Sequence, residues 1–195
     1  VSPQGYKIYE FNYKGGDVRF RGAMAQDVVQ KNPMAVGTLD FIGLNYYSRM
    51  HVKGQLSLKE PFSFEKREND IQTDMDYALY PEGFYKALHT ISTLNKPIYV
   101  TENGVADRGD TIRTLFINRY LYALKMALKD GIDIRGYFYW TLMDNFEWAE
   151  GYDMKFGLYE VDFKTQKRSL RKSSKLFSEI IKRRGADERG YIVDI

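Results

Sequence analysis

The chain has 195 residues, of which 44% are hydrophobic and 28% are charged, and its formal net charge is +3. This composition is typical of one soluble globular domain and excludes a disordered chain. The absence of cysteine excludes disulfides and thiolate metal sites, and with His51 and His89 as the only histidines no metal centre is predicted.

Segments that would bring the chain to a membrane or a nucleic acid are not evident. The first residues, 1–5, lack the basic start and apolar run of a signal peptide, and no apolar stretch reaches about 18 residues. Nine Lys or Arg residues fall between Lys164 and Arg184. A nucleic-acid patch is one interpretation, but no aromatic residues alternate with these charges as a stacking platform requires, so a solvated helix face is favoured. We expect a cytoplasmic protein without a membrane or nucleic-acid partner.

The first readable pattern is a strand, a loop and a helix. Residues 40–47 form a short, mostly apolar run that predicts a strand, and residues 48–76 predict a long loop of the kind that is often functional in compact domains. Pro81 opens a helix, because proline lacks only an N–H that has no helical partner there. Pro97 disfavours helical geometry at the residue before it and so ends the helix. The apolar face of this helix is predicted to contain Phe84, Leu88, Ile91 and Leu94.

Two further strand and helix pairs follow along the chain. Residues 98–101 are β-branched and aromatic and predict a strand, which the polar turn 102–104 ends. A helix over about 111–130 has an apolar stripe of period 3.6, with Asp110 as its predicted N-cap and Gly131 just beyond its C-terminus. Residues 136–142 predict a buried strand, and residues 173–184 predict the last helix.

The order strand, helix, strand, helix, strand, helix favours an α/β fold. These strands are apolar without alternation, which is typical of a parallel sheet that helices cover. Functional residues of such folds lie at the C-terminal ends of the strands. Asn45 and Tyr47 close the first strand, Glu102 follows the second, and Asp144 to Trp148 follow the third. The sequence therefore predicts that an amide, a phenol, carboxylates and an indole meet at one rim of the sheet.

Three stretches resemble the signatures of glycoside hydrolase family 1. They are residues 140–148 (WTLMDNFEW), 99–104 (YVTENG) and 40–47 (DFIGLNYY), in the order that the family has them along the chain. Each motif alone could occur by chance, whereas three in order are specific. The resemblance runs from near Thr38 to near Lys182, and little is found before Thr38.

The resemblance implies a (β/α)₈ TIM barrel of which this chain holds about strands 6–8. Residues 1–195 are therefore interpreted as the C-terminal segment of a single barrel domain. Three strands cannot close a barrel of eight, so the missing strands are expected from an N-terminal barrel segment. That segment also carries the acid/base carboxylate of the family.

The resemblance implies catalytic roles for three residues. Glu102 matches the nucleophile of a retaining glycosidase, whose second carboxyl group stands roughly 5–5.5 Å away and protonates the leaving oxygen. Tyr47 matches a residue whose hydroxyl donates to the charged nucleophile and fixes its direction. Asn45 matches a neighbour that lines the same subsite. For these two residues, packing at the strand edge remains the alternative.

Four more residues match the family's sugar-binding positions. Trp140 matches an indole that packs against the C–H face of a pyranose, with a core tryptophan as the alternative. Glu147 matches a carboxylate that accepts two sugar hydroxyls in charge-assisted bonds. Trp148 is expected to donate its indole N–H to another hydroxyl, and Phe156 to flank the C6 end of the sugar. Relatives that act on 6-phosphorylated sugars lack a carboxylate at the position of Glu147, so an unphosphorylated sugar is expected.

The function implied is a retaining β-glycosidase, similar to β-glucosidases, that acts on a β-glycoside or oligosaccharide through a covalent glycosyl-enzyme intermediate. No cofactor and no metal are expected. Because the acid/base half is absent, the isolated chain is expected to be inactive. The alternative is a non-catalytic fragment that binds sugar or serves a structural role in a larger assembly.

Overall fold

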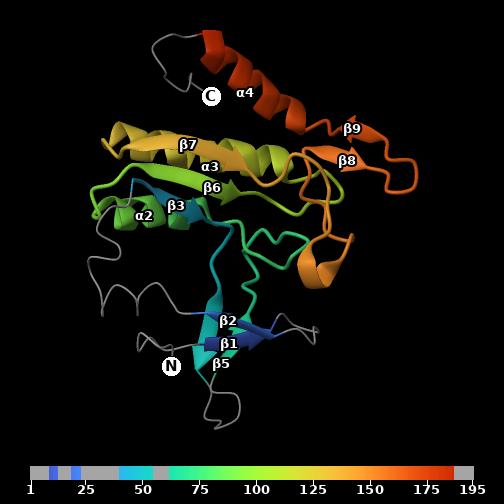
Figure 1. Ribbon diagram of the computed structural model, residues 1–195, viewed down its shortest axis with the longest axis horizontal. Helices are drawn as coiled ribbons and strands as arrows, with labels where there is room; N and C mark the ends of the chain where they lie inside the picture. Colours follow the sequence, from blue (N-terminus) through green and yellow to red (C-terminus); the bar gives the residue numbers. More distant parts are fainter. Residues whose placement is uncertain (1–8, 13–18, 23–39, 55–61, 187–195) are drawn as a thin grey trace.

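A computed structural model describes residues 9–12, 19–22, 40–54 and 62–186 of the chain (Figure 1). The strands are β1 (Tyr9–Asn12), β2 (Arg19–Gly22), β3 (Ile42–Asn45), β4 (His51–Gly54), β5 (Phe62–Glu65), β6 (Ile98–Asn103), β7 (Ile134–Tyr139), β8 (Tyr159–Val161) and β9 (Arg168–Leu170). The helices are α2 (Pro81–Ser92), α3 (Arg113–Lys129) and α4 (Ser174–Ala186), with a short 3₁₀ turn, η2, at Trp148–Glu150. No described helix combines the length and apolar character that crossing a membrane needs.

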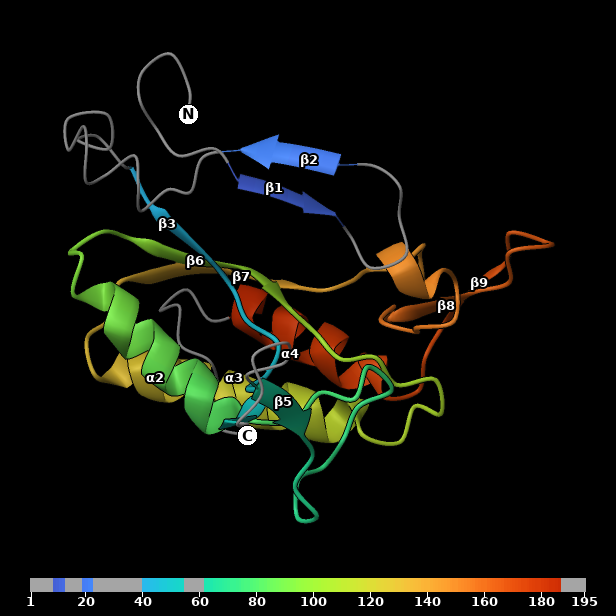
Figure 2. The same ribbon diagram turned by 90° about the horizontal axis from the view of Figure 1, so that it is seen from below.

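The centre of the molecule is a parallel sheet with the order β3-β6-β7. Helix α2 connects β3 to β6, α3 connects β6 to β7, and α4 follows β7, so the predicted alternation of strands and helices is confirmed. Figure 2 shows the three helices gathered on one side of these strands. The C-terminal ends of all three strands therefore lie at the same edge of the sheet, as the sequence predicted.

The hydrophobic core lies between this sheet and its helices. Ile98 and Val100 of β6 are fully buried, as are Phe84 and Leu88 of α2. Phe177 of α4 completes the layer by contacting the rings of two tyrosines of β7, Tyr137 and Tyr139. Burial of such apolar surface contributes about 25 cal/mol per Å² and is the main term that holds the layers together.

The opposite face of the sheet carries exposed apolar side chains. Side chains alternate between the two faces of a strand, so the neighbours of the buried residues in β7 and before β3 point away from the helices. Phe138 is 58% exposed and Phe41 is 51% exposed. Among the described strands, β3 and β7 also pair along one edge only. The two free edges mark where further strands of the sheet would add, and the uncovered face is the one that such strands would enclose.

Several boundaries differ from the predictions. The first helix ends at Ser92, and Leu94 is 61% exposed rather than part of its apolar face. Strand β6 extends through Glu102 and Asn103, which were predicted to form a turn. Strands β4 and β5 form an antiparallel hairpin inside the predicted loop 48–76, of which residues 55–61 lie outside the described part. Strands β8 and β9 form a second hairpin that the sequence did not reveal.

The prediction of Asp110 as the N-cap of α3 is wrong. Ile112 occupies the N-cap position and makes no side-chain cap bond, and the carboxylate of Asp107 instead accepts hydrogen bonds from the backbone N–H groups of Thr111, Ile112 and Arg113 at 2.8–3.1 Å. Asp110 has a positive φ of 54° and accepts bonds from Ser173 instead. At the other end of the helix, Gly131 has a φ of 86°, which confirms the glycine predicted just beyond the C-terminus.

Candidate active site

Glu102 lies near the end of the central strand β6, where the two residues that follow it hold the backbone in place. The side chain of the following residue, Asn103, is fully buried. Its amide donates to the carbonyl of Tyr46 at 2.6 Å and accepts from the hydroxyl of Tyr137 at 2.8 Å, so it ties β6 to both adjacent strands. At Gly104 an added Cβ would stand 1.8 Å from the carbonyl oxygen of Trp140, so only glycine allows this close approach of two strand ends.

Tyr47 and Glu102 form a direct hydrogen bond. The hydroxyl of Tyr47 donates to Oε2 of Glu102 at 2.7 Å. Burial raises the pKa of Tyr47 well above its ordinary value, and the bond to Glu102 raises this pKa further. Tyr47 therefore keeps its proton and remains a donor, and its hydrogen bond fixes the orientation of the Glu102 carboxylate.

A cavity of about 180 Å³ opens at this edge of the sheet. Six of the seven predicted site residues line it: Tyr47, Glu102, Trp140, Glu147, Trp148 and Phe156. They come from four segments, since Tyr47 follows β3, Glu102 is in β6, Trp140 follows β7 and the other three lie farther along the chain. The predicted convergence of carboxylates, a phenol and indoles is thus present in one small cavity.

Asn45 does not line this cavity. It is paired with Glu102 in the register of β3 and β6, but its Oδ1 accepts a hydrogen bond from the hydroxyl of Thr101 at 2.6 Å. Both side chains lie on the uncovered face of the sheet, where Asn45 and Thr101 are exposed. The amide of Asn45 therefore lies beside Glu102 in the strand register, but it points to the uncovered face of the sheet and not into the cavity.

Met75 and Tyr77 also line the cavity and were not predicted. They lie in the segment between β5 and α2, near the end of the predicted loop. Burial raises the pKa of Tyr77, and the nearby charge of Glu147 adds to the rise. The loop position was the one available signal, since no motif marked these two residues.

Glu147 is a partly buried carboxylate with unused capacity to accept hydrogen bonds. Its Oε2 is buried and has no partner among the described residues, while the side chain of Trp140 bonds to the carboxylate. Burial raises the pKa of Glu147 above its ordinary value, and the charge of Glu102 contributes to the rise even though the bond from Trp140 opposes it. A ligand hydroxyl at Oε2 would satisfy a buried acceptor that the protein leaves unpaired.

We expect Glu147→Gln to raise stability at neutral pH while it weakens sugar binding. The raised pKa means that ionisation of Glu147 is less favourable in the folded than in the unfolded state, so its cost in stability grows as pH rises from the ordinary glutamate pKa to the raised one. The stability difference between parent and variant should therefore vanish in acid, below the ordinary pKa of glutamate. Hydrogen bonds to charged groups contribute about 1.5–3 kcal/mol each, so sugar affinity should fall by about 10- to 100-fold. Melting curves from acid to neutral pH and sugar titrations measure both effects, and a variant that is less stable at neutral pH would contradict the assignment.

Phe156 completes the cavity from the segment after η2. It is 4% exposed, and its ring stands edge-on to the ring of Tyr47 with a centroid distance of 6.1 Å. Such edge-to-face pairs contribute about 0.5–1.5 kcal/mol beyond their buried area. Phe156 therefore supports the phenol that donates to Glu102.

The other cavity of note has fewer groups that could act in catalysis. A larger cavity of about 620 Å³ lies between α2 and α3, where Glu82 is the only carboxylate among its lining residues. It is on the helix side, away from the strand ends. Within the described ranges, no three His, Cys, Asp or Glu side chains are grouped so as to hold a metal ion.

Known proteins resemble both the sequence and this arrangement. The profile of glycosyl hydrolase family 1 matches residues 18–186, a wider range than the motifs indicated. The beta-galactosidase of Pyrococcus woesei is 37% identical over 169 aligned positions, which cover 77% of this chain and 33% of that relative. Beta-glucosidase A of Thermotoga maritima is 36% identical over 161 positions, which cover 77% of this chain and 36% of that relative.

The solved structures agree with the sequence matches. The family 1 beta-glucosidase from Thermotoga maritima superposes with a TM-score of 0.71 at 34% identity, over 80% of this chain and 37% of that chain. A further structure of the enzyme from this organism holds galacto-hydroximolactam. This chain thus spans about a third of the length of the curated relatives it matches.

Proposed function

The chain belongs to glycosyl hydrolase family 1, and from that membership we propose that it is the nucleophile-bearing part of a retaining β-glycosidase. Glu102 attacks the anomeric carbon of a β-glycoside while the bond to the leaving oxygen breaks and that oxygen takes a proton from the acid/base residue. Water then gives its proton back to the same residue and attacks the anomeric carbon, which releases the sugar and frees Glu102. The acid/base residue comes from barrel strands outside this chain.

The observation that carries the proposal is the hydrogen bond from Tyr47 to Glu102 at the mouth of a cavity lined by Trp140, Glu147 and Phe156. A nucleophilic carboxylate must be aimed at the anomeric carbon, and the phenol that donates to it at 2.7 Å holds its direction. The aromatic walls suit the apolar C–H face of a pyranose. Glu147 offers an open acceptor to the hydroxyl edge of the ring.

The substrate we propose is an unphosphorylated β-glycoside. Glu147 is the reason, because its carboxylate would repel the negative charge of a phosphate bound in the same cavity. The related proteins are named as enzymes for both β-glucosides and β-galactosides. We therefore propose a neutral hexopyranose as the bound sugar.

Covalent labelling tests the proposal. The complete barrel that includes this chain should be inactivated by 2,4-dinitrophenyl 2-deoxy-2-fluoro-β-glucoside. The fluorine slows both formation and hydrolysis of the glycosyl-enzyme, whereas the good leaving group speeds its formation only, so the intermediate accumulates. Mass spectrometry of the digested protein should find one added fluoroglucosyl group on the peptide that contains Glu102. The variant Glu82→Ala, which removes a glutamate of a surface helix, should be labelled normally. Labelling at any other carboxylate would refute the assignment.

The second candidate is a fragment that binds sugar without catalysis, and the uncovered sheet face favours it for the isolated chain. Phe41 and Phe138 are exposed there, and the described residues include no second carboxylate assigned to proton transfer. Intact mass of the protein purified from its source distinguishes the two candidates. A folded monomer of 22.8 kDa would support the fragment, and a longer chain would support the enzyme.

A further inference from the structure

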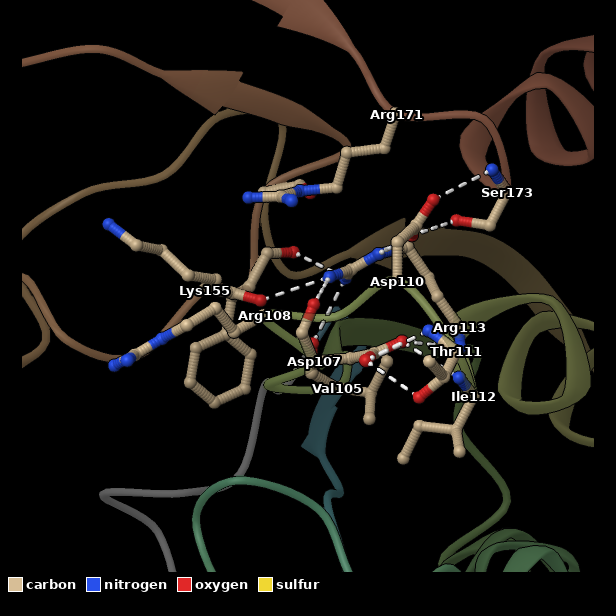
Figure 3. Close-up of polar contacts among 12 residues, drawn as sticks. Val105, Asp107, Arg108, Asp110, Thr111, Ile112, Arg113, Lys155, Arg171 and Ser173 are labelled. Carbon is tan, nitrogen blue, oxygen red and sulfur yellow. Dashed lines mark hydrogen bonds and ion pairs between the residues drawn. The ribbon is translucent and has the colours of Figure 1, made fainter.

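Arg113 is a fully buried cation at the first position of α3, with no exposed surface. Figure 3 shows its guanidinium at the centre of a group of oxygen atoms. Every one of its three nitrogens donates at 2.7–3.1 Å, and the acceptors are Asp110 Oδ1, the hydroxyl of Tyr139 and the carbonyls of Val105, Asp107, Lys155 and Phe156. Burying a guanidinium costs several kcal/mol unless its hydrogen bonds are satisfied, so Arg113 depends on these acceptors to be stable in the core.

The acceptors belong to three segments that each carry part of the sugar cavity. Val105 and Asp107 are in the loop that directly follows Glu102 and β6. Tyr139 is the last residue of β7 and precedes Trp140. Lys155 and Phe156 lie in the segment between η2 and β8, and the phenyl ring of Phe156 lines the cavity. The side chain of Arg113, which lies outside the cavity, therefore connects the three backbone segments that carry Glu102, Trp140 and Phe156.

The position of Arg113 is itself fixed by the start of α3. Its backbone N–H donates to the Asp107 carboxylate at 2.8 Å, and its Nε donates to Asp110 at 3.1 Å. Two backbone hydrogen bonds link the same segments. The N–H of Asp107 donates to the carbonyl of Lys155, and the N–H of Thr141 donates to the carbonyl of Phe156. The carbonyl of Phe156 thus accepts from Arg113 and from the residue after Trp140.

The geometry requires arginine rather than a generic cation. A guanidinium presents five N–H donors in a rigid plane, whereas a lysine ammonium has three donors at one point. The acceptors here surround the guanidinium from three separate segments, so an ammonium could reach only part of them.

We propose that Arg113 is a positioning residue for the sugar subsite, which holds Phe156 and Trp140 at a fixed place relative to Glu102. This inference rests on the proposed glycosidase function. Without the guanidinium of Arg113, the segment at Lys155 and Phe156 keeps only the backbone bond from Asp107 to the loop after β6. The cavity wall at Phe156 then loosens while the core of Phe84, Leu88 and Ile98 stays intact.

The test compares Arg113→Lys with Ser173→Ala in the complete barrel. Ser173 is the matched control because it is buried and joins the same network, but it contacts Asp110 on the side of α4, away from the cavity. The active fraction of each protein is titrated with the fluoroglucoside, and kcat and KM are expressed per active site. Displacements near 1 Å can cost about 100-fold, so kcat/KM of Arg113→Lys should fall about 10- to 100-fold with KM increased. Ser173→Ala should lower the melting temperature and leave both constants within about twofold.

Tryptophan fluorescence gives a readout that needs no turnover. Trp140 and Trp148 are the only tryptophans of the chain, and both line the cavity. With the missing barrel half built from tryptophan-free sequence, the emission of folded Arg113→Lys should shift, while that of Ser173→Ala should match the parent. If Arg113→Lys does not fold, Tyr139→Phe removes one acceptor and should give the same shift and a smaller rise in KM.

Two results would overturn the inference. One is a folded Arg113→Lys variant whose tryptophan emission, kcat and KM equal those of the parent, which would mean that Arg113 contributes to stability alone. The other is a Ser173→Ala variant that changes the emission, kcat and KM as much as Arg113→Lys does. A parent protein that the fluoroglucoside does not label would refute the proposed function instead, and the fluorescence comparison would still decide whether Arg113 positions the cavity.

Discussion

Replacing Glu102 with alanine should lower kcat of the complete barrel on 4-nitrophenyl β-glucoside by about 10⁵- to 10⁶-fold, the scale expected when a covalent nucleophile is removed. Tyr47 would lose its acceptor on Glu102, but the other cavity walls would remain, so substrate binding should change far less than turnover. Stopped-flow or long-time absorbance assays measure the loss. The melting temperature should stay near that of the parent, because Glu102 contributes no core packing.

Added azide separates loss of the nucleophile from damage to the site. In Glu102→Ala the anion can occupy the space that the carboxylate leaves and attack the anomeric carbon of an activated glycoside. One displacement replaces two, so the product should be the α-glycosyl azide rather than a β-configured product. Glu82→Ala, the surface control, should keep parental activity and show no effect of azide. A β-azide from Glu102→Ala, or full activity without azide, would show that another residue is the nucleophile.

The parts of the site that the sequence predicted are those in short local motifs at strand ends. Tyr47, Glu102 and Glu147 come at or after the ends of runs that predict strands, and parallel strands bring such ends together. That reasoning needs only local patterns and one topological rule. Trp140 and Phe156 were predicted from the resemblance to glycoside hydrolase family 1. Together, the topological rule and the family resemblance account for the six predicted residues that line one cavity.

The parts that were missed depend on tertiary contacts. Asp107 caps α3 from five residues before Ile112, beyond the spacing of a local capping motif, and the nearer Asp110 was chosen instead. Met75 lies in a segment without hydrophobic periodicity, so nothing local placed it at the cavity. Arg113 reads as an ordinary charged residue at the start of a helix, and only the fold shows that four carbonyls from distant segments surround it.

The uncovered sheet face is the feature that distinguishes this chain from a complete barrel. Phe138 of β7 and Phe41 before β3 point away from the helices and are more than half exposed. Exposed apolar surface together with unpaired strand edges promotes association. The matched relatives are about three times longer than their aligned part, since 33% and 36% of their lengths are covered. We therefore expect this face to be the interior of the barrel in the longer protein.

A lysine at position 138 should have opposite effects in the two contexts. In the isolated chain Phe138→Lys replaces an exposed apolar side chain, so stability should change by no more than about 0.5 kcal/mol and aggregation should decrease. In the complete barrel the same lysine would be an unpaired buried charge, which costs about 3–5 kcal/mol. Glycosidase activity should then be lost together with the fold. Light scattering of the isolated chain and melting curves of the complete barrel measure the two effects.

Tyr122→Lys is the matched control, because Tyr122 is 59% exposed but lies on α3, on the helix side of the sheet. This substitution should be close to neutral in the isolated chain and in the complete barrel. Equal behaviour of the two lysine variants in the complete barrel would mean that the face of Phe138 remains open to solvent there. Glu102 would then act on a surface, not inside a barrel, and the isolated chain would be the functional unit.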